Sequence, residues 1–336
     1  MVGSRRGGLP ASGSYAERVD TVSGLGPAAL VVNTASRRGA DAFPSARQAL
    51  PRHGIELGLA RAVTDPSTLP DAVREAAISG YRLVVVGGGD GTLSGAAGVL
   101  ADLPRPYHAV LGVLPLGTAN DFARTLGIPR GVEAASRVLA TGKIVDIDLG
   151  RANGRAFLNV ASLGLSVEVA RELRAGLKRW LGPAAYPVAA LLAYRRHRPF
   201  RARLEFLDGE QGPLHLGDLL QVGIANGRHY GGGATVAPDA GIDDHLLDVF
   251  AIEKGRLRDH VTIAGLLRNG RFVEHEKVRH LTTTQVLVTT DGEDQAVNLD
   301  GEIGTTTPAR FSVQSNALDV VVPQHVRDLR CESRPE

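Results

Sequence analysis

The stretch Val84-Val-Val-Gly-Gly-Gly-Asp-Gly-Thr-Leu93 decides the fold of this chain. Its three consecutive valines predict a buried β-strand. Its glycines predict a turn whose backbone is free to take left-handed or strained conformations and lets a large ligand come close. From Leu93 onward, small residues predict a helix. A strand, a glycine-rich turn and a helix N-terminus form an anion site, because unpaired N–H groups and the helix dipole point at the ligand. The alternative is a plain glycine hairpin.

The segments on either side of this turn repeat the order of strand, turn and helix. Residues 28–39 predict a strand that enters a polar turn, and residues 40–51 predict the helix that follows. A second strand is expected over 55–63 and a helix over 69–79, while 109–124 again reads as strand, turn and helix. A β-α-β-α-β-α order is typical of a doubly wound sheet, which binds ligands at the carboxyl ends of its strands.

The second half of the chain changes to alternation with period two, which predicts a separate β-sandwich from about 149 to 322. The expected strands cover residues 155–160, 202–207, 219–225, 247–252, 284–289 and 296–299. One basic, amphipathic helical stretch, 167–198, interrupts them. This stretch either contacts an anionic membrane surface, or it is a helix that covers the apolar core and exposes its charged face to solvent.

Composition limits the possible classes of protein. With 336 residues, two domains are expected. A net charge of +2 gives no argument for a nucleic-acid partner. Cys331 is the only cysteine, so a disulfide framework and a thiolate metal cluster are excluded, and a reducing cytosol fits. Residues 1–25 lack an apolar run and predict a disordered lead-in rather than a secretory signal. No apolar run reaches the roughly 18 residues that a membrane span needs.

Two motifs together resemble one known family. Gly88-Gly-Asp-Gly-Thr92 and Leu116-Gly-Thr-Ala-Asn-Asp-Phe122 are similar to the nucleotide-site motifs of the bacterial soluble diacylglycerol/lipid kinases, which are related to sphingosine kinases, NAD kinases and phosphofructokinases. No G-x-x-x-x-G-K-[ST] pattern occurs, which excludes a P-loop enzyme. The resemblance implies an α/β ATP-binding domain over 26–148, a β-sandwich lipid domain over 149–322 and a C-terminus, 323–336, that returns to the first domain.

The resemblance also implies an ATP site and identifies its residues. From the residues alone, an arginine in the turn after the first strand either pairs with phosphate or faces solvent, and Thr64 either contacts the nucleotide or caps a turn. Asn120 and Asp121 are expected to cap the helix that follows them. The implied ATP contacts are Asn33, Thr34, Ala35, Ser36, Arg37, Thr64, Gly88, Gly89, Asp90, Gly91, Thr92, Leu93, Ser94, Gly117 and Thr118.

Three carboxylates are the predicted catalytic residues. In Asn298-Leu-Asp-Gly-Glu302, Asp300 and Glu302 would orient the lipid hydroxyl and accept its proton, whereas Asp90 would orient Mg²⁺ on the phosphates. The alternative for this stretch is a solvated Asp-Gly hairpin. Asp291-Gly-Glu293 has the same three letters, but an apolar strand precedes the second copy and Ile303 follows it, as in the family.

Two further loops are implied by the resemblance. Residues 226–233 are expected to line the interdomain cleft or to form a plain hairpin, with His229 as a structural or cleft-lining residue rather than a catalytic one. Residues 238–249 match a loop that holds a structural Mg²⁺, whose ligands fall here on Gly241, Asp244 and Leu246. Hard oxygen ligands suit this ion. His245 replaces the usual glycine, which predicts a distorted turn and a weaker or absent ion.

The sequence therefore predicts an ATP- and Mg²⁺-dependent kinase that phosphorylates a hydroxyl of a lipid such as diacylglycerol. It would act in the cytoplasm, with peripheral contact at the inner face of the membrane. The family typically has Asn-Glu where this chain has Ser94 and Gly95. The alternatives are an NAD kinase and a nucleotide- or lipid-binding protein without turnover. The identity of the lipid and the oligomeric state, a homodimer being one option, stay open.

Overall fold

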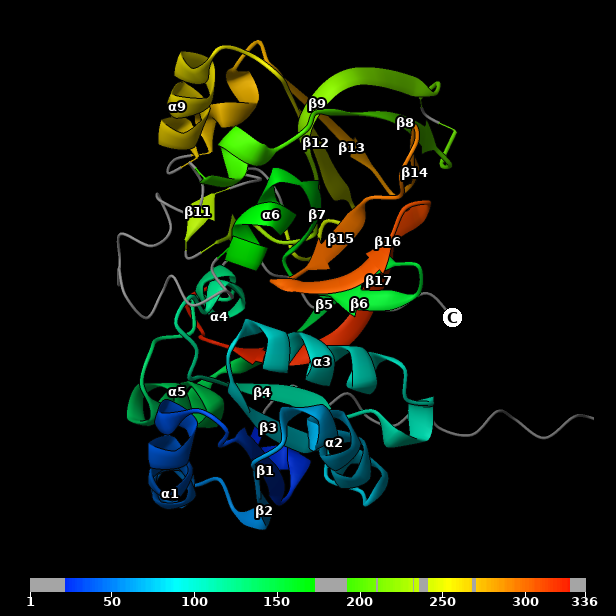
Figure 1. The fold of residues 1–336 in the computed structure, drawn as a ribbon. Helices are drawn as coiled ribbons and strands as arrows, with labels where there is room; N and C mark the ends of the chain where they lie inside the picture. The colour runs from blue at the N-terminus through cyan, green and yellow to red at the C-terminus, as the bar shows by residue number, and fades with distance from the viewer. Residues whose placement is uncertain are drawn as a thin grey trace, which may run out of the picture.

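The computed structural model describes residues 22–172, 192–209, 211–231, 233–235, 241–267 and 270–326. The chain forms two parts, stacked one above the other in Figure 1, which also marks the elements named below. Each part has an apolar core of its own. The two-domain architecture predicted from the sequence is confirmed.

The N-terminal part is a parallel sheet between two layers of helices. The strand order is β2-β1-β3-β4. Helices α1 and α5 pack together, as do α2 and α3. β1, β3 and β4 are almost wholly buried, because helices cover both faces of a parallel sheet. The elements are β1 (Ala28–Asn33), α1 (Arg37–Arg52), β2 (Leu57–Val63), α2 (Leu69–Ile78), β3 (Leu83–Gly88), α3 (Asp90–Ala101), β4 (Val110–Pro115), α4 (Asp121–Thr125) and α5 (Val132–Thr141).

Two boundaries in this part differ from prediction. Helix α3 begins at Asp90 instead of Leu93, so the aspartate of the glycine turn lies in the first helical turn. The predicted disordered lead-in is too long, because Val22–Leu25 form a 3₁₀ helix with Val22 and Leu25 in the core. Residues 1–21 of that prediction lie outside the described residues.

The second part is mainly antiparallel. Each of the six predicted strands falls on an observed strand, and the predicted strand 155–160 divides into β6 and the start of β7. The elements are β5 (Lys143–Ala152), β6 (Arg155–Phe157), β7 (Val160–Gly164), α6 (Leu165–Glu172), β8 (Phe200–Phe206), β9 (Leu214–Ala225), β10 (His229–Tyr230), β11 (Ala234–Thr235), β12 (Leu247–Glu253), α9 (Leu257–Leu266), β13 (Val278–Thr283), β14 (Gln285–Thr290), β15 (Ala296–Leu299), β16 (Glu302–Thr306) and β17 (Ala309–Val322).

Strands β5 and β17 connect the two parts. They pair antiparallel along most of their length, and β17 also pairs with β14 at one end and with β4, through Val320 and Leu111, at the other. The strands of both parts therefore belong to one continuous sheet instead of two separate ones. Because β1, β3 and β4 are parallel, their carboxyl ends lie at one edge of the sheet, where this fold class binds ligands.

Among the described residues, no helix is long and apolar enough to cross a membrane. Most of the predicted basic stretch 167–198 lies outside the described residues, which include only 167–172 and 192–198 of it.

Candidate active site

Three turns meet at the carboxyl ends of β1, β3 and β4. Asn33 ends β1, and its side-chain amide donates a hydrogen bond to the Thr92 hydroxyl over 3.0 Å. Arg38 in the first turn of α1 donates to the Gly117 carbonyl over 3.2 Å. The structure thus brings the three predicted ATP-contact stretches together on one surface.

The N-terminus of α3 opens onto this surface. The first hydrogen bond within the helix runs from the Leu93 N–H to the Gly89 carbonyl over 3.0 Å. The N–H groups of Asp90, Gly91 and Thr92 precede that bond and point out of the helix end. The helix has twelve residues, so the positive end of its dipole lies at the same place. These groups fit a phosphate.

The glycines of this turn allow close packing and do not supply left-handed backbone. None of the four glycines in residues 87–91 has a positive φ, so of the two predicted alternatives, left-handed or strained backbone, the left-handed one does not occur. A Cβ atom on Gly88 would lie 2.4 Å from Cγ2 of Thr92, and one on Gly117 would lie 2.6 Å from Cα of Gly89. The two glycine turns touch each other, and side chains there would push them apart.

Substituting Gly117 with alanine should therefore weaken ATP binding by about tenfold and destabilise the fold by about 1–3 kcal/mol, the usual cost of overpacking. Its Cβ would also lie 2.8 Å from the Asn120 side-chain oxygen. Calorimetric ATP titration and denaturant unfolding measure the two effects. Gly212→Ala is the matched control, because nothing lies within 4 Å of its added Cβ. Wild-type affinity in Gly117→Ala would contradict this packing role.

Asp90, and not Asn120, caps α4. The Asp90 carboxylate accepts the Phe122 N–H over 3.1 Å. Asn120 has a left-handed φ of 54° and makes no side-chain capping bond; its amide donates to the Gly117 carbonyl over 2.9 Å. The prediction of an Asn120 cap is therefore wrong. The Oδ1 atom of Asn120 is buried without a hydrogen-bond partner among the described residues, so this turn has an unused acceptor.

The other predicted ATP contacts lie on the rim of the surface. The Thr34 hydroxyl donates to the Val63 carbonyl over 3.1 Å, which joins the first turn to the end of β2. Thr64 is exposed and does not cap the following turn, because Asp65 accepts the Ser67 N–H over 3.0 Å.

Two arginines that the sequence analysis did not select also bond to these turns. Arg37 and Thr118 are exposed, while Ser36 caps α1. Of the adjacent residues Arg37 and Arg38, it is Arg38 that bonds to the second glycine turn, through the Gly117 carbonyl. Arg130 donates to the Ala119 carbonyl of the same turn over 2.9 Å. Two adjacent arginines look alike in sequence, and only the direction in which α1 starts distinguishes them.

Asp300 faces backbone amides. Strand β15 pairs with β7. Asp300 is the residue that follows β15, so it lies beside the segment that leads into β7. Its carboxylate accepts the N–H groups of Leu158, Asn159 and Val160 over 2.6, 2.9 and 3.1 Å. Burial raises the pKa of Asp300 above its usual value, although the three backbone hydrogen bonds and the nearby Ser94 side chain on α3 act in the opposite direction.

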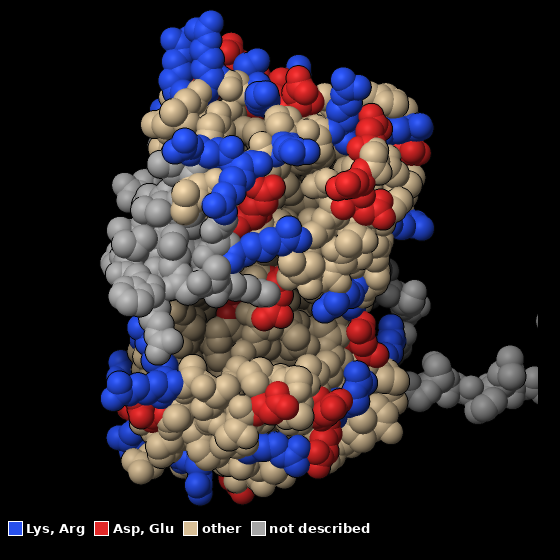
Figure 2. Space-filling view, in the orientation of Figure 1, with Lys and Arg blue, Asp and Glu red and all other residues tan. Residues whose placement is uncertain are grey.

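Glu302 faces the glycine turn. It is exposed, and its Oε1 lies 3.4 Å from the position that a Cβ on Gly91 would take. Glu302, Ser94 and Gly95 line a pocket of about 380 Å³ between α3 and the second part. Figure 2 shows a hollow between the two parts, with acidic side chains at its upper edge. Gly95 stands where the family typically has a glutamate. A Cβ on Gly95 would meet nothing within 4 Å, so the missing side chain leaves open space.

A contact joins α4, which follows the second glycine turn, to β10. The Thr125 hydroxyl and Nδ1 of His229 lie 3.1 Å apart. Burial lowers the pKa of His229, and the nearby charges of Arg124 and Arg228 lower it further. Arg124 also packs against Gly233. We therefore expect the His229 imidazole to be neutral near pH 7, and its position along the cleft stays a prediction.

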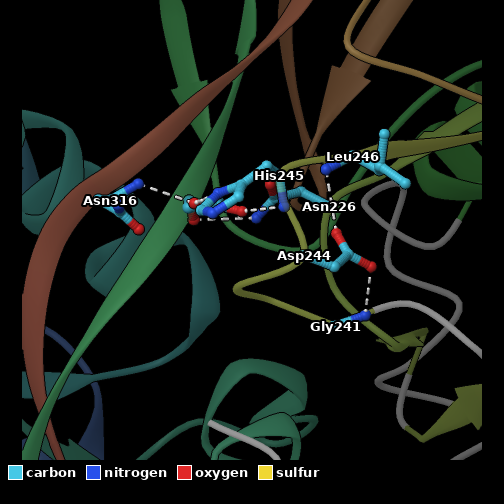
Figure 3. A network of polar contacts seen from close by, with 7 residues as sticks. Asn226, Gly241, Asp244, His245, Leu246 and Asn316 are labelled. Carbon is cyan, nitrogen blue, oxygen red and sulfur yellow. Dashed lines mark hydrogen bonds and ion pairs between the residues drawn. The ribbon is translucent and has the colours of Figure 1, made fainter. Parts of the chain in front are cut away.

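The predicted metal residues come together in a separate network, shown in Figure 3. The Asp244 carboxylate accepts the N–H of Gly241 over 2.7 Å and that of Leu246 over 3.0 Å. Burial raises the pKa of Asp244; the two hydrogen bonds oppose this, and the charges of Asp248 and Asp148 add to it. Each carboxylate oxygen keeps lone-pair capacity for a cation, and the surrounding negative charge suits one.

His245 fits this turn by pairing with a buried carboxylate. Its φ of 62° is left-handed, which explains why a glycine is expected there. Its N–H donates to Asp148 over 2.7 Å, and its Nδ1 lies 3.1 Å from the same carboxylate. Asp148 also accepts the Asn316 N–H over 2.8 Å. The loop is thereby bonded to β5 and β17, the strands that join the two parts.

Comparison with known proteins shows two family matches. Residues 27–152 match the diacylglycerol kinase catalytic domain, and residues 159–322 match the YegS C-terminal NAD kinase beta sandwich-like domain. A diacylglycerol kinase of Bacillus subtilis is 31% identical over 254 residues, which cover 75% of this chain and 82% of that protein. A Pseudomonas aeruginosa protein named "Probable lipid kinase YegS-like" is 40% identical over 252 residues, covering 75% and 80%.

The fold has a close counterpart among solved structures. A crystal structure of a diacylglycerol kinase from Bacillus anthracis superposes with a TM-score of 0.73 at 23% identity, over 90% of this chain and 98% of that one. At this identity the likeness establishes the two-part fold.

Proposed function

The chain belongs to the diacylglycerol kinase family of phosphotransferases, and from that premise we propose that it transfers the γ-phosphate of ATP to a hydroxyl of a neutral membrane lipid such as diacylglycerol. The observation that carries this proposal is the position of Glu302 over the first turn of α3. A carboxylate there can reach a hydroxyl that approaches a phosphate bound at the helix N-terminus.

The reaction needs positioned charges and an oriented hydroxyl. The N–H groups at the start of α3 and the Thr92 hydroxyl would hold the phosphates. The lipid oxygen forms a bond to the γ-phosphorus, the bond from that phosphorus to the bridging oxygen of ADP breaks, and the hydroxyl proton passes to Glu302. Mg²⁺ would neutralise phosphate charge when bound, and Asp90 is the carboxylate that would hold it.

Asp300 takes a different role in this proposal. Three backbone N–H groups already occupy three of the about four lone-pair sites of its carboxylate. It therefore has little capacity left to take a proton from a substrate. We assign Asp300 as a positioning residue that holds the start of β7 against Ser94 of α3. This keeps Glu302, two residues further on, above the phosphate turn.

Phosphate transfer from γ-labelled ATP to a panel of lipids in mixed micelles tests the proposal. Label in a lipid band that Glu302→Gln and Asp90→Asn both abolish is the expected result, and the labelled band names the substrate. Label in NADP would identify an NAD kinase. ATP binding without transfer to any acceptor would identify a binding protein without turnover.

A structural Mg²⁺ on Asp244, Gly241 and Leu246 is a separate proposal. Saturating Mg²⁺ without nucleotide should raise the melting temperature of the protein by about 5 °C, the order expected for one site filled far above its Kd. Asp244→Asn should remove this shift, because the substitution takes away the only carboxylate of the set. The adjacent Asp243→Asn is the control and should keep it. An equal shift in Asp244→Asn would contradict the site.

A further inference from the structure

Helix α9 has an apolar stripe on its outer face. Leu257 and Val261 are 55% and 64% exposed, and Ala264 is exposed as well. Their spacing of four and then three residues puts them on one side of the helix. On another side, Ile263 is buried against the cluster that contains Phe272. The helix is therefore anchored by its inner face and presents a small apolar ridge to solvent.

Basic side chains surround this ridge. Lys254, Arg256 and Arg258 are exposed at its start, and the Arg258 side chain is 75% exposed. The carboxylate of Asp259 accepts the Arg256 N–H over 2.7 Å and so caps the helix, and its other oxygen lies 3.6 Å from Nε of Arg258, which leaves Lys254 and Arg256 as the excess positive charge. Figure 2 shows Lys and Arg side chains projecting from the upper end of the molecule, where Figure 1 places α9.

Neighbouring acidic groups already have cationic partners. Glu253 lies 3.4 Å from Arg279, and Glu274 lies 3.0 Å from Arg271. The ridge thus combines apolar side chains with a local excess of positive charge. This combination complements a layer that has an apolar interior and anionic groups at its surface.

Contacts connect α9 to β10 and β11, which lie beside α4. The rings of Tyr194 and His260 lie 5.4 Å apart, which joins the helix to the segment that carries Arg195. The Leu267 carbonyl at the end of the helix accepts the Thr235 N–H of β11 over 2.8 Å. Strand β11 pairs with β10, which carries the His229 that contacts α4.

We propose that the outer face of α9, defined by Leu257, Val261 and Ala264 with their basic neighbours, docks on the surface of an anionic lipid bilayer. The inference rests on the proposed function, in which the acceptor is a membrane lipid. Shallow insertion of an apolar ridge, together with attraction of Lys and Arg to anionic headgroups, is how interfacial helices bind membranes. A stable protein interface buries about 1,200–2,000 Å², far more than two aliphatic side chains supply.

Co-sedimentation of the full chain with vesicles tests the docking face. We expect binding to vesicles of phosphatidylcholine with phosphatidylglycerol, weaker binding to phosphatidylcholine alone, and loss of binding at high salt. Leu257→Glu with Val261→Glu should lower the vesicle partition coefficient by about tenfold or more, because apolar contact is lost and negative charge is added. Ile78→Glu, at a side chain 48% exposed on α2, should bind like wild type.

The activity in detergent micelles separates this inference from the proposed function. The double variant should keep wild-type transfer in micelles and lose it on vesicles. A folded double variant that binds vesicles like wild type would overturn the docking face, as would a wild type that binds no vesicles. A change of oligomeric state in the double variant would instead identify the face as a contact between copies. Absence of transfer in micelles by wild type would refute the proposed function, whatever the vesicles show.

Discussion

Glu302→Gln is expected to lower kcat by about two to four orders of magnitude, the usual contribution of a positioned general base. Glutamine keeps the size of the side chain and the contact with the first turn of α3, but it cannot take the hydroxyl proton. ATP affinity should stay within about twofold of wild type, because the N–H groups at the helix N-terminus are unchanged. Single-turnover phosphate transfer and calorimetric ATP binding measure the two quantities.

The chain provides a matched control for this variant. Glu293 follows Asp291 and glycine in the same order of letters, but it lies in an exposed loop between β14 and β15, where Gly292 has a φ of 85°. Glu293→Gln should therefore retain wild-type kcat. If Glu302→Gln retains kcat within about twofold, the proton must leave to another group and the assignment of Glu302 fails.

Asp300→Ala is expected to reduce the free energy of unfolding by about 2–5 kcal/mol, because three backbone N–H groups would lose their charged acceptor. Alanine also fits poorly at a φ of 49°, where aspartate and asparagine are tolerated better. Asp300→Asn should lie between alanine and wild type, since its single carbonyl oxygen can accept part of the set. Denaturant unfolding measures all three proteins.

Asp291→Ala is the control for this series and should change stability by no more than about 0.5 kcal/mol, as for other exposed positions. Activity decides between the two roles of Asp300. As a positioning residue, Asp300→Asn should lose stability together with activity. Wild-type stability in Asp300→Asn, combined with complete loss of transfer, would instead identify Asp300 as the base.

The repeated order of strand, glycine turn and helix was readable from the sequence because it depends on local patterns. Consecutive valines over 84–86 and the apolar spacing over 69–79 are set by neighbours in the chain, and the structure places β3 and α2 there. The two nucleotide-site motifs likewise identified the turns that meet at the sheet edge. The end of the disordered N-terminal segment could not be predicted from the sequence, because Val22 and Leu25 pack into a core built from distant segments.

The roles of individual polar side chains depended on partners far away in sequence. Asn120 looked like a helix cap, yet Asp90 from the other turn accepts the Phe122 N–H because the two glycine turns touch. Likewise, nothing near His245 in the sequence shows that it bonds to Asp148, which reaches it from β5.

By itself, the sequence determined the fold class, the family and the turns that form the site, since these are encoded in short patterns of residue type and spacing. Only the tertiary structure decided which carboxylate of Asp300 and Glu302 faces the glycine turn before α3. The pairing of β15 with β7 puts Asp300 against three backbone N–H groups that lie 140 to 142 residues away in the chain. A left-handed backbone at Asp300 then starts the turn that carries Glu302 to Gly91. Strand register and backbone direction, unlike residue type, are properties of the folded chain.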